Sequence, residues 1–127
     1  MSEVTILIVE DELLIAKNLT LKLKRLGYKV SEIVSSGAEA IATVNLNKPD
    51  LILMDIAIKG DLDGIETMEK IKQIDDIPVI YLTAYADEKT MERAEKTGSC
   101  GYLLKPFKDK ELREIIKMVL TKHRLGD

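Results

Sequence analysis

Four short apolar runs in this chain each end in a reactive polar side chain. The runs and the polar residues that follow them are residues 6–9 with Glu10 and Asp11, residues 51–54 with Asp55, residues 79–82 with Thr83, and residues 102–104 with Lys105. Runs of this length, rich in aliphatic and β-branched residues, are typical of strands buried in a parallel sheet. Because ligands bind beyond the carboxyl ends of the strands in an open α/β sheet, the sequence predicts that three acids, a hydroxyl and an amine meet at one edge.

Helical patterns separate the apolar runs, so strand and helix alternate along the whole chain. The expected strands are residues 4–9, 28–34, 51–54, 79–82 and 101–104. The first expected helix carries apolar residues from Ile15 to Leu26 and ends at Gly27. The other expected helices are residues 38–46, a helix that begins near Gly64, residues 88–96 with Asp87 as N-cap, and a helix with an apolar stripe from Leu112 to Leu120. This alternation predicts a parallel sheet with helices on both faces and right-handed crossovers.

The fold class we expect is α/β, a flavodoxin-like (βα)5 three-layer sandwich with strand order 2-1-3-4-5. The second strand mixes apolar with polar residues, as an edge strand does. In this order the point where the winding reverses lies between the first and third strands, which puts Asp11 and Asp55 side by side.

The bulk composition limits the classes of protein that fit. With 127 residues the chain is expected to form one domain, residues 1–127. A net charge of −3 argues against direct nucleic-acid binding by charge, and no apolar run approaches the roughly 20 residues of a membrane span. The N-terminus does not have the pattern of a signal peptide. The single Cys fits a reducing compartment, so we expect a cytoplasmic protein without a membrane partner.

The predicted acidic cluster calls for a cation. Clustered carboxylates raise each other's pKa unless a positive charge neutralises them. Mg²⁺ prefers carboxylate oxygens and keeps several waters, so it is the simplest stabilising ion. A carboxylate such as Asp55, placed beside Mg²⁺, Lys105 and Thr83, is a suitable acceptor for a phosphoryl group.

Over essentially its full length the chain resembles the receiver domain of two-component response regulators. The stretches that carry the resemblance are Ile6–Glu12, Leu51–Asp55, Thr83–Ala84 and Gly101–Phe107, in this order and with similar spacing. The resemblance implies that a sensor histidine kinase or a phosphotransfer protein phosphorylates Asp55. It also implies that Glu10 and Asp11 hold Mg²⁺ together with Asp55 and the backbone carbonyl of Ala57.

The same resemblance assigns the remaining site residues. Thr83 matches the switch hydroxyl, Lys105 the phosphate-binding lysine and Tyr102 the switch aromatic. The bond from Lys105 to Pro106 is a candidate cis peptide, which an X-Pro bond permits at modest cost.

We expect helix 88–96, strand 101–104 and the last helix to form the output surface. This surface would contact a downstream protein or output domain. Helix 88–96 has a thin apolar face, essentially Met91 and Ala94, which suits a surface that rearranges. Such a protein catalyses only its own phosphorylation and dephosphorylation and is not an enzyme for an outside substrate.

The chain departs from the family pattern in two places. Glu10 stands where Asp is commoner, so its longer side chain is expected to reach a metal through water. The loop of residues 56–64 lacks the usual Pro and is one residue longer.

Three alternatives stay open at this stage. A phosphatase-like hydrolase with an aspartyl-phosphate intermediate would carry Asp-x-Asp after the first strand, where this chain has Glu10, Asp11 and Glu12. A flavodoxin-like cofactor binder would carry a hydroxyl- and glycine-rich loop there. A degenerate receiver that only binds partners is disfavoured by the complete set of Asp11, Asp55, Thr83 and Lys105.

Overall fold

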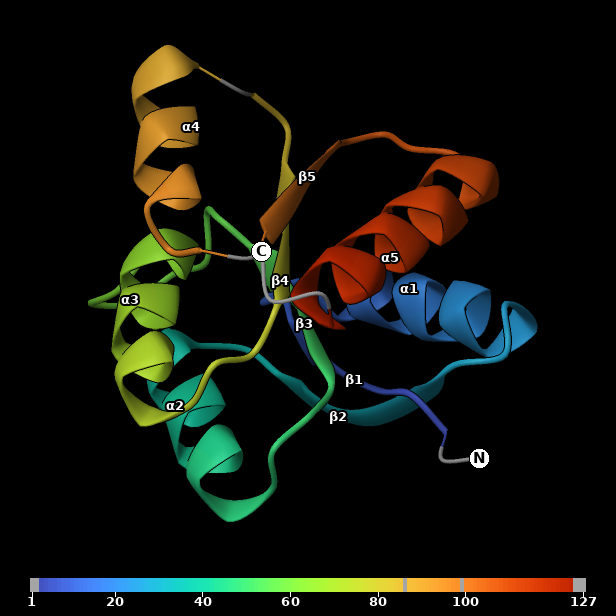
Figure 1. The fold of residues 1–127 in the computed structure, drawn as a ribbon, viewed down its shortest axis with the longest axis horizontal. Coiled ribbons are helices and arrows are strands. Elements are labelled where there is room, and N and C mark those ends of the chain that lie inside the picture. The colour runs from blue at the N-terminus through green and yellow to red at the C-terminus, as the bar shows by residue number, and fades with distance from the viewer. Residues whose placement is uncertain (1–2, 86, 99, 125–127) are drawn as a thin grey trace.

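The computed structural model describes residues 3–85, 87–98 and 100–124 (Figure 1). Five strands alternate with five helices in this part of the chain. The strands are β1 Thr5–Val9, β2 Lys29–Val34, β3 Leu51–Asp55, β4 Val79–Thr83 and β5 Cys100–Leu104. The helices are α1 Leu13–Arg25, α2 Gly37–Leu46, α3 Gly64–Ile74, α4 Glu88–Glu95 and α5 Asp109–Arg124.

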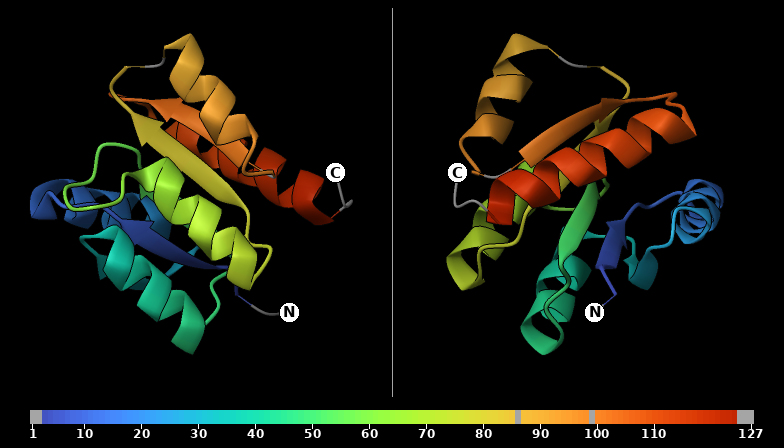
Figure 2. Two further views of the ribbon diagram at one scale, coloured as in Figure 1. Left: turned by 90° about the vertical axis from the view of Figure 1, so that its left-hand side faces the viewer. Right: turned by 45° about the vertical axis from the view of Figure 1, so that its right-hand side comes forward.

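The strands form one parallel sheet in the order β2-β1-β3-β4-β5. The predicted flavodoxin-like fold class and strand order are therefore confirmed. Figures 1 and 2 show α1 and α5 on one face of the sheet and α2, α3 and α4 on the other, which gives the expected three layers. Among the described residues, no helix is long and apolar enough to cross a membrane.

The core is divided into two halves by the sheet. Successive strand residues point to opposite faces, so Leu7 and Val9 pack with α2 and α3 whereas Ile6 and Ile8 pack with α1 and α5. The strands β1, β3 and β4 are buried on both faces and supply most of this core. Burial on both sides explains why the sequence shows continuous apolar runs instead of an alternating pattern.

The helix starts are defined by local chemistry that the sequence partly predicts. Asp87 caps α4 as expected, because its side chain accepts from the backbone N–H of Thr90 at 2.7 Å. Asp63 caps α3 in a reciprocal capping box with Glu66, at distances of 2.8 and 2.9 Å. The N-cap of α1 is Glu12, which makes no side-chain cap.

The ends of β3 and β4 differ from the prediction. Asp55 is the last residue of β3 and Thr83 is the last residue of β4, whereas the apolar pattern ends each strand one residue earlier. Both residues pair with neighbouring strands, Asp55 with Leu82 and Thr83 with Leu104. The backbone ladder therefore fixes their positions at the edge of the sheet.

Gly64 permits the close approach of α3 to the end of β3. A Cβ at this position would overlap the carbonyl oxygen of Asp55 and lie 2.9 Å from the Cα of Ile56. These neighbours are backbone atoms, so a side chain could be fitted only by moving the helix or the strand.

We predict that Gly64→Ala lowers the free energy of unfolding by about 1–3 kcal/mol, the usual cost of overpacking a buried site. Urea denaturation measures this change. The exposed Gln73 on the same helix provides the control, since Gln73→Ala should stay within about 0.5 kcal/mol of the parent protein. Equal midpoints for the two variants would contradict the role of Gly64.

Candidate functional site

Three carboxylates meet at the carboxyl edge of the sheet between β1 and β3. One carboxylate oxygen from each of Glu10, Asp11 and Asp55 lies within 4.8 Å of the others. Pairing of β1 with β3, in which Val9 faces Met54, brings the residues that follow these strands together. The topology therefore brings the three acids together at the edge of the sheet, as predicted from the sequence.

Glu10 is the most enclosed of the three acids, with a fully buried side chain. One of its carboxylate oxygens accepts from the backbone N–H of Glu12 at 3.1 Å, and the other lies 3.3 Å from the Nζ of Lys105. Burial raises the pKa of Glu10, and the negative charge of Asp55 adds to the rise, whereas the Glu12 N–H and the Lys105 ammonium oppose it. Lys105 and the amide thus stabilise the ionised form of an acid that burial disfavours.

Asp55 and Asp11 are oriented by the loop that follows β3. Asp55 is only 5% exposed as a residue. Its Oδ1 atom accepts from the backbone N–H of Ala57 at 3.2 Å. The Oδ2 atom of Asp11 accepts from the backbone N–H of Lys59 at 3.0 Å. The loop of residues 56–64 therefore supplies backbone donors to two of the three acids.

Lys105 brings the positive charge to this cluster. Its backbone N–H donates to the carbonyl of Thr83 at 2.8 Å and so extends the pairing of β5 with β4. Its Nζ lies 3.5 Å from the Oδ1 of Asp55 as well as near Glu10. The peptide bond between Lys105 and Pro106, the candidate identified in the sequence, is cis.

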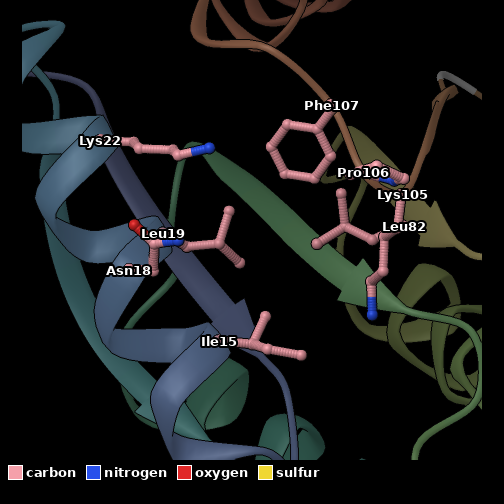
Figure 3. A pocket seen from close by; sticks show the side chains of 8 residues that line it. All are labelled: Ile15, Asn18, Leu19, Lys22, Leu82, Lys105, Pro106 and Phe107. Atoms are coloured by element: carbon pink, nitrogen blue, oxygen red, sulfur yellow. The ribbon is translucent and has the colours of Figure 1, made fainter.

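Beside Lys105, a largely apolar pocket of about 230 Å³ opens between α1 and the loop after β5. It is lined by Ile15, Asn18, Leu19, Lys22, Leu82, Lys105, Pro106 and Phe107. Figure 3 shows the Lys22 side chain extending from α1 toward the Phe107 ring, and its Nζ lies 5.0 Å from the ring centroid. Lys105 therefore borders both the acidic cluster and this pocket, which Lys22 also lines.

Thr83 ends at the same edge of the sheet, but its hydroxyl is turned to the backbone. The hydroxyl donates to the carbonyl of Tyr85 at 2.8 Å and accepts from the N–H of the same residue at 3.2 Å. In this arrangement the hydroxyl stabilises the backbone of the loop after β4. The structure therefore brings Thr83 to the site without engaging its hydroxyl with the acids.

Tyr102 lies on β5 under α4, away from the acids. Its ring stacks on that of Tyr81 with centroids 6.3 Å apart, and its hydroxyl donates to the carbonyl of Met91 in α4 at 3.1 Å. Burial raises the pKa of Tyr102, so the hydroxyl stays protonated and able to donate. Tyr102 therefore contacts α4 directly.

The backbone donors of the site cannot be recognised from the sequence. The N–H groups of Glu12, Ala57 and Lys59 orient the three acids, and any residue type except Pro provides such a group. Side-chain patterns in the sequence therefore carry no signal for these donors.

The donor set suits a hard divalent cation. It consists of carboxylate oxygens from Glu10, Asp11 and Asp55, and the exposed Ala57 lies two residues beyond Asp55. Mg²⁺ binds such oxygen ligands, whereas zinc sites usually include thiolate or imidazole. The acidic cluster is therefore consistent with a Mg²⁺ site.

Comparison with known proteins identifies the family. Residues 6–117 match the family model of the response regulator receiver domain, and the chain belongs to this family. The match favours the receiver over the hydrolase and flavodoxin-like alternatives.

Relatives and solved structures agree with this family. The chain is 34% identical over 119 residues to the transcriptional regulatory protein PdtaR of Mycobacterium tuberculosis, covering 94% of this chain and 58% of that protein. A signal receiver domain of a modulated diguanylate cyclase from Desulfovibrio desulfuricans is 35% identical with a TM-score of 0.90, covering 99% of this chain and 100% of that one. A CheY-like receiver domain protein from Methanospirillum hungatei has a TM-score of 0.88 at 28% identity, with coverage of 99% and 100%. The chain spans about half the length of the curated relatives it matches.

Proposed function

We propose that this domain, residues 1–127, receives a phosphoryl group on Asp55 from a sensor histidine kinase or a phosphotransfer protein. The observation that carries the proposal is the position of Lys105, whose Nζ lies 3.5 Å from the Oδ1 of Asp55 inside an acidic cluster. The phosphorylated domain then acts on a downstream protein or output domain through α4, β5 and α5.

The chemistry depends on positioning and charge neutralisation. A carboxylate oxygen of Asp55 attacks phosphorus in line, the bond from phosphorus to the donor nitrogen breaks, and the electron pair leaves with the imidazole. Lys105 holds an oxygen of the transferred group. Asp11, Asp55 and the carbonyl of Ala57 would hold Mg²⁺, with Glu10 behind them. The ion, when bound, supplies positive charge to the phosphoryl oxygens.

The reaction modifies the protein itself. Attack on Asp55 produces an acyl phosphate, and later attack of water on phosphorus releases inorganic phosphate and restores the carboxylate. The domain thus catalyses its own phosphorylation and dephosphorylation and turns over no outside substrate.

In the proposed conformational switch, the Thr83 hydroxyl exchanges its hydrogen-bond partner. Its hydroxyl donates to the Tyr85 carbonyl in the structure, and a phosphoryl oxygen on Asp55 would compete for this proton. Movement of the Thr83 side chain would free the space beside β5 into which Tyr102 turns. Since the Tyr102 hydroxyl is bonded to Met91, this turn would shift α4.

We predict that acetyl phosphate with Mg²⁺ adds one phosphoryl group to the protein and none to Asp55→Asn, because the amide is a poor nucleophile. Intact-mass spectrometry measures the gain. The exposed Asp61 of the following loop gives the control, since Asp61→Asn should label like the parent. Full labelling of Asp55→Asn would show that another residue is the acceptor.

We expect Asp11→Asn to weaken Mg²⁺ binding about tenfold or more, a loss of about 1.4 kcal/mol, because it removes a charged ligand from the cluster. Calorimetric or NMR titration with MgCl₂ gives the affinities, and Asp61→Asn again serves as control. If wild type and Asp11→Asn bind Mg²⁺ equally, Asp11 is not a ligand.

We predict that Thr83→Ala remains phosphorylatable but loses the response of α4, β5 and α5. A hydrogen bond to a charged group contributes about 1.5–3 kcal/mol, enough to shift a two-state population about ten- to a hundredfold. NMR shifts on this face before and after phosphorylation provide the measurement. A response equal to that of wild type would remove Thr83 from the switch.

A further inference from the structure

Helix α4 is attached to the rest of the domain with little apolar burial. Among its residues, Glu88–Glu95, all of which the structure describes, Ala94 alone is buried. By comparison, α3 buries Ile65, Met68 and Ile71 among others. Polar contacts must therefore carry a large part of the attachment of α4.

Two of these contacts come from tyrosines under the helix. The hydroxyl of Tyr102 on β5 donates to the carbonyl of Met91 at 3.1 Å. The hydroxyl of Tyr81 on β4 lies 2.8 Å from the Oγ1 of Thr97, just beyond the helix. These bonds hold the inner side of α4 to the sheet.

A third contact joins α4 to the loop of residues 56–64, which follows Asp55. The guanidinium of Arg93 lies 3.0 Å from the Oδ2 of Asp63, and both side chains are partly exposed. This hydrogen bond to Asp63 raises the pKa of Arg93. The other oxygen of Asp63 accepts from the N–H of Glu66 at 2.8 Å and so caps α3. One carboxylate therefore serves α3 and α4 together.

Asp63 is close to the reacting carboxylate along the chain and through hydrogen bonds. The next residue, Gly64, donates its N–H to the carbonyl of Ile56 at 2.9 Å, directly after Asp55. The loop closed by this bond also contains Lys59, whose N–H orients Asp11. A displacement of Asp63 would thus be felt by the donors that position two acids. Figures 1 and 2 show α3 and α4 as neighbours on the same face of the sheet.

We propose that the ion pair of Asp63 and Arg93 is a latch between α4 and the loop of residues 56–64. The latch couples the position of α4 to this loop and favours the arrangement of α4 in this structure. In the latch, Asp63 is a positioning residue that acts through the loop of residues 56–63. A movement of α4 on activation would stretch the pair, and a pair that is stronger in one state shifts the population toward that state. Because coupling between two sites is reciprocal, a partner that displaces α4 would also alter phosphorylation of Asp55.

An ion pair that is not coupled to the site would act on it only through its charges. Substituting the basic and the acidic partner separately distinguishes such a charge effect from a latch, because the two substitutions change the net charge in opposite directions. Arg93→Gln makes the domain more negative, whereas Asp63→Asn makes it less negative. A field effect on the acidic site would move the two variants in opposite directions, whereas loss of the latch moves them in the same direction. Asn caps a helix about as well as Asp, and Gln and Arg have similar helix propensities, so both variants keep the helices.

The first measurement is amide hydrogen exchange on the unphosphorylated protein. Arg93→Gln and Asp63→Asn should each raise the exchange rates of α4 about two- to fivefold, the range expected for a partly exposed pair, and the double variant should show no further rise. Lys96→Gln, at the exposed end of α4, serves as the control and should leave these rates unchanged. Additive effects in the double variant, or rates equal to the control, would overturn the latch.

The second measurement is the rate of labelling by acetyl phosphate with Mg²⁺, and it rests on the proposed function. The two single variants and the double variant should all label about two- to fivefold faster than wild type. Opposite changes in the two single variants, or unchanged rates, would overturn the coupling to the site. Absence of labelling in wild type would refute the proposed function, whereas the exchange measurement would still decide whether the latch exists.

Discussion

The rest of the site depends on the ammonium of Lys105, which lies between the carboxylates of Glu10 and Asp55 at 3.3 and 3.5 Å. The Glu10 side chain is fully buried, and burial raises its pKa. A buried carboxylate such as that of Glu10 resists ionisation unless a positive charge lies nearby. Lys105 therefore stabilises the charge that the site needs before any divalent ion arrives. This arrangement also places a cation directly beside the carboxylate that we propose as the phosphoryl acceptor.

The sheet provides the rigidity that this charge arrangement requires. Glu10 follows β1, Asp55 ends β3 and Lys105 follows β5, so the three side chains come from strands that are far apart in sequence. The strand order β2-β1-β3-β4-β5 brings their carboxyl ends to one edge, and two buried cores hold the strands in register. A rearrangement at this edge would disturb close-packed apolar side chains, which makes the acids a fixed element of the domain.

The parts that the sequence predicts are those with a local signal. Apolar runs and turn residues predict the fold class and strand order, and the polar residues after the runs predict the cluster of Glu10, Asp11 and Asp55. Asp87 is recognisable as an N-cap. The inclusion of Asp55 and Thr83 in their strands has no such signal, since pairing with neighbouring strands decides it. The bonds of Thr83 to Tyr85 and of Arg93 to Asp63 depend on rotamers and distant contacts, which periodicity does not specify.

Apolar burial and polar contacts differ in energy, and this difference is consistent with the proposal that phosphorylation moves α4 and leaves the sheet in place. Fully burying a large apolar side chain contributes about 1.5–3 kcal/mol, and α3 has several such residues, whereas α4 buries only Ala94 among its eight. A partly exposed ion pair contributes about 0.2–1 kcal/mol and a neutral hydrogen bond about 0.5–1.5 kcal/mol. One new hydrogen bond from Thr83 to a charged phosphoryl group, about 1.5–3 kcal/mol, is comparable to the polar contacts that hold α4. It is small beside the apolar packing that holds the strands, so in the proposed switch a change at Asp55 would displace the helix without disturbing the sheet.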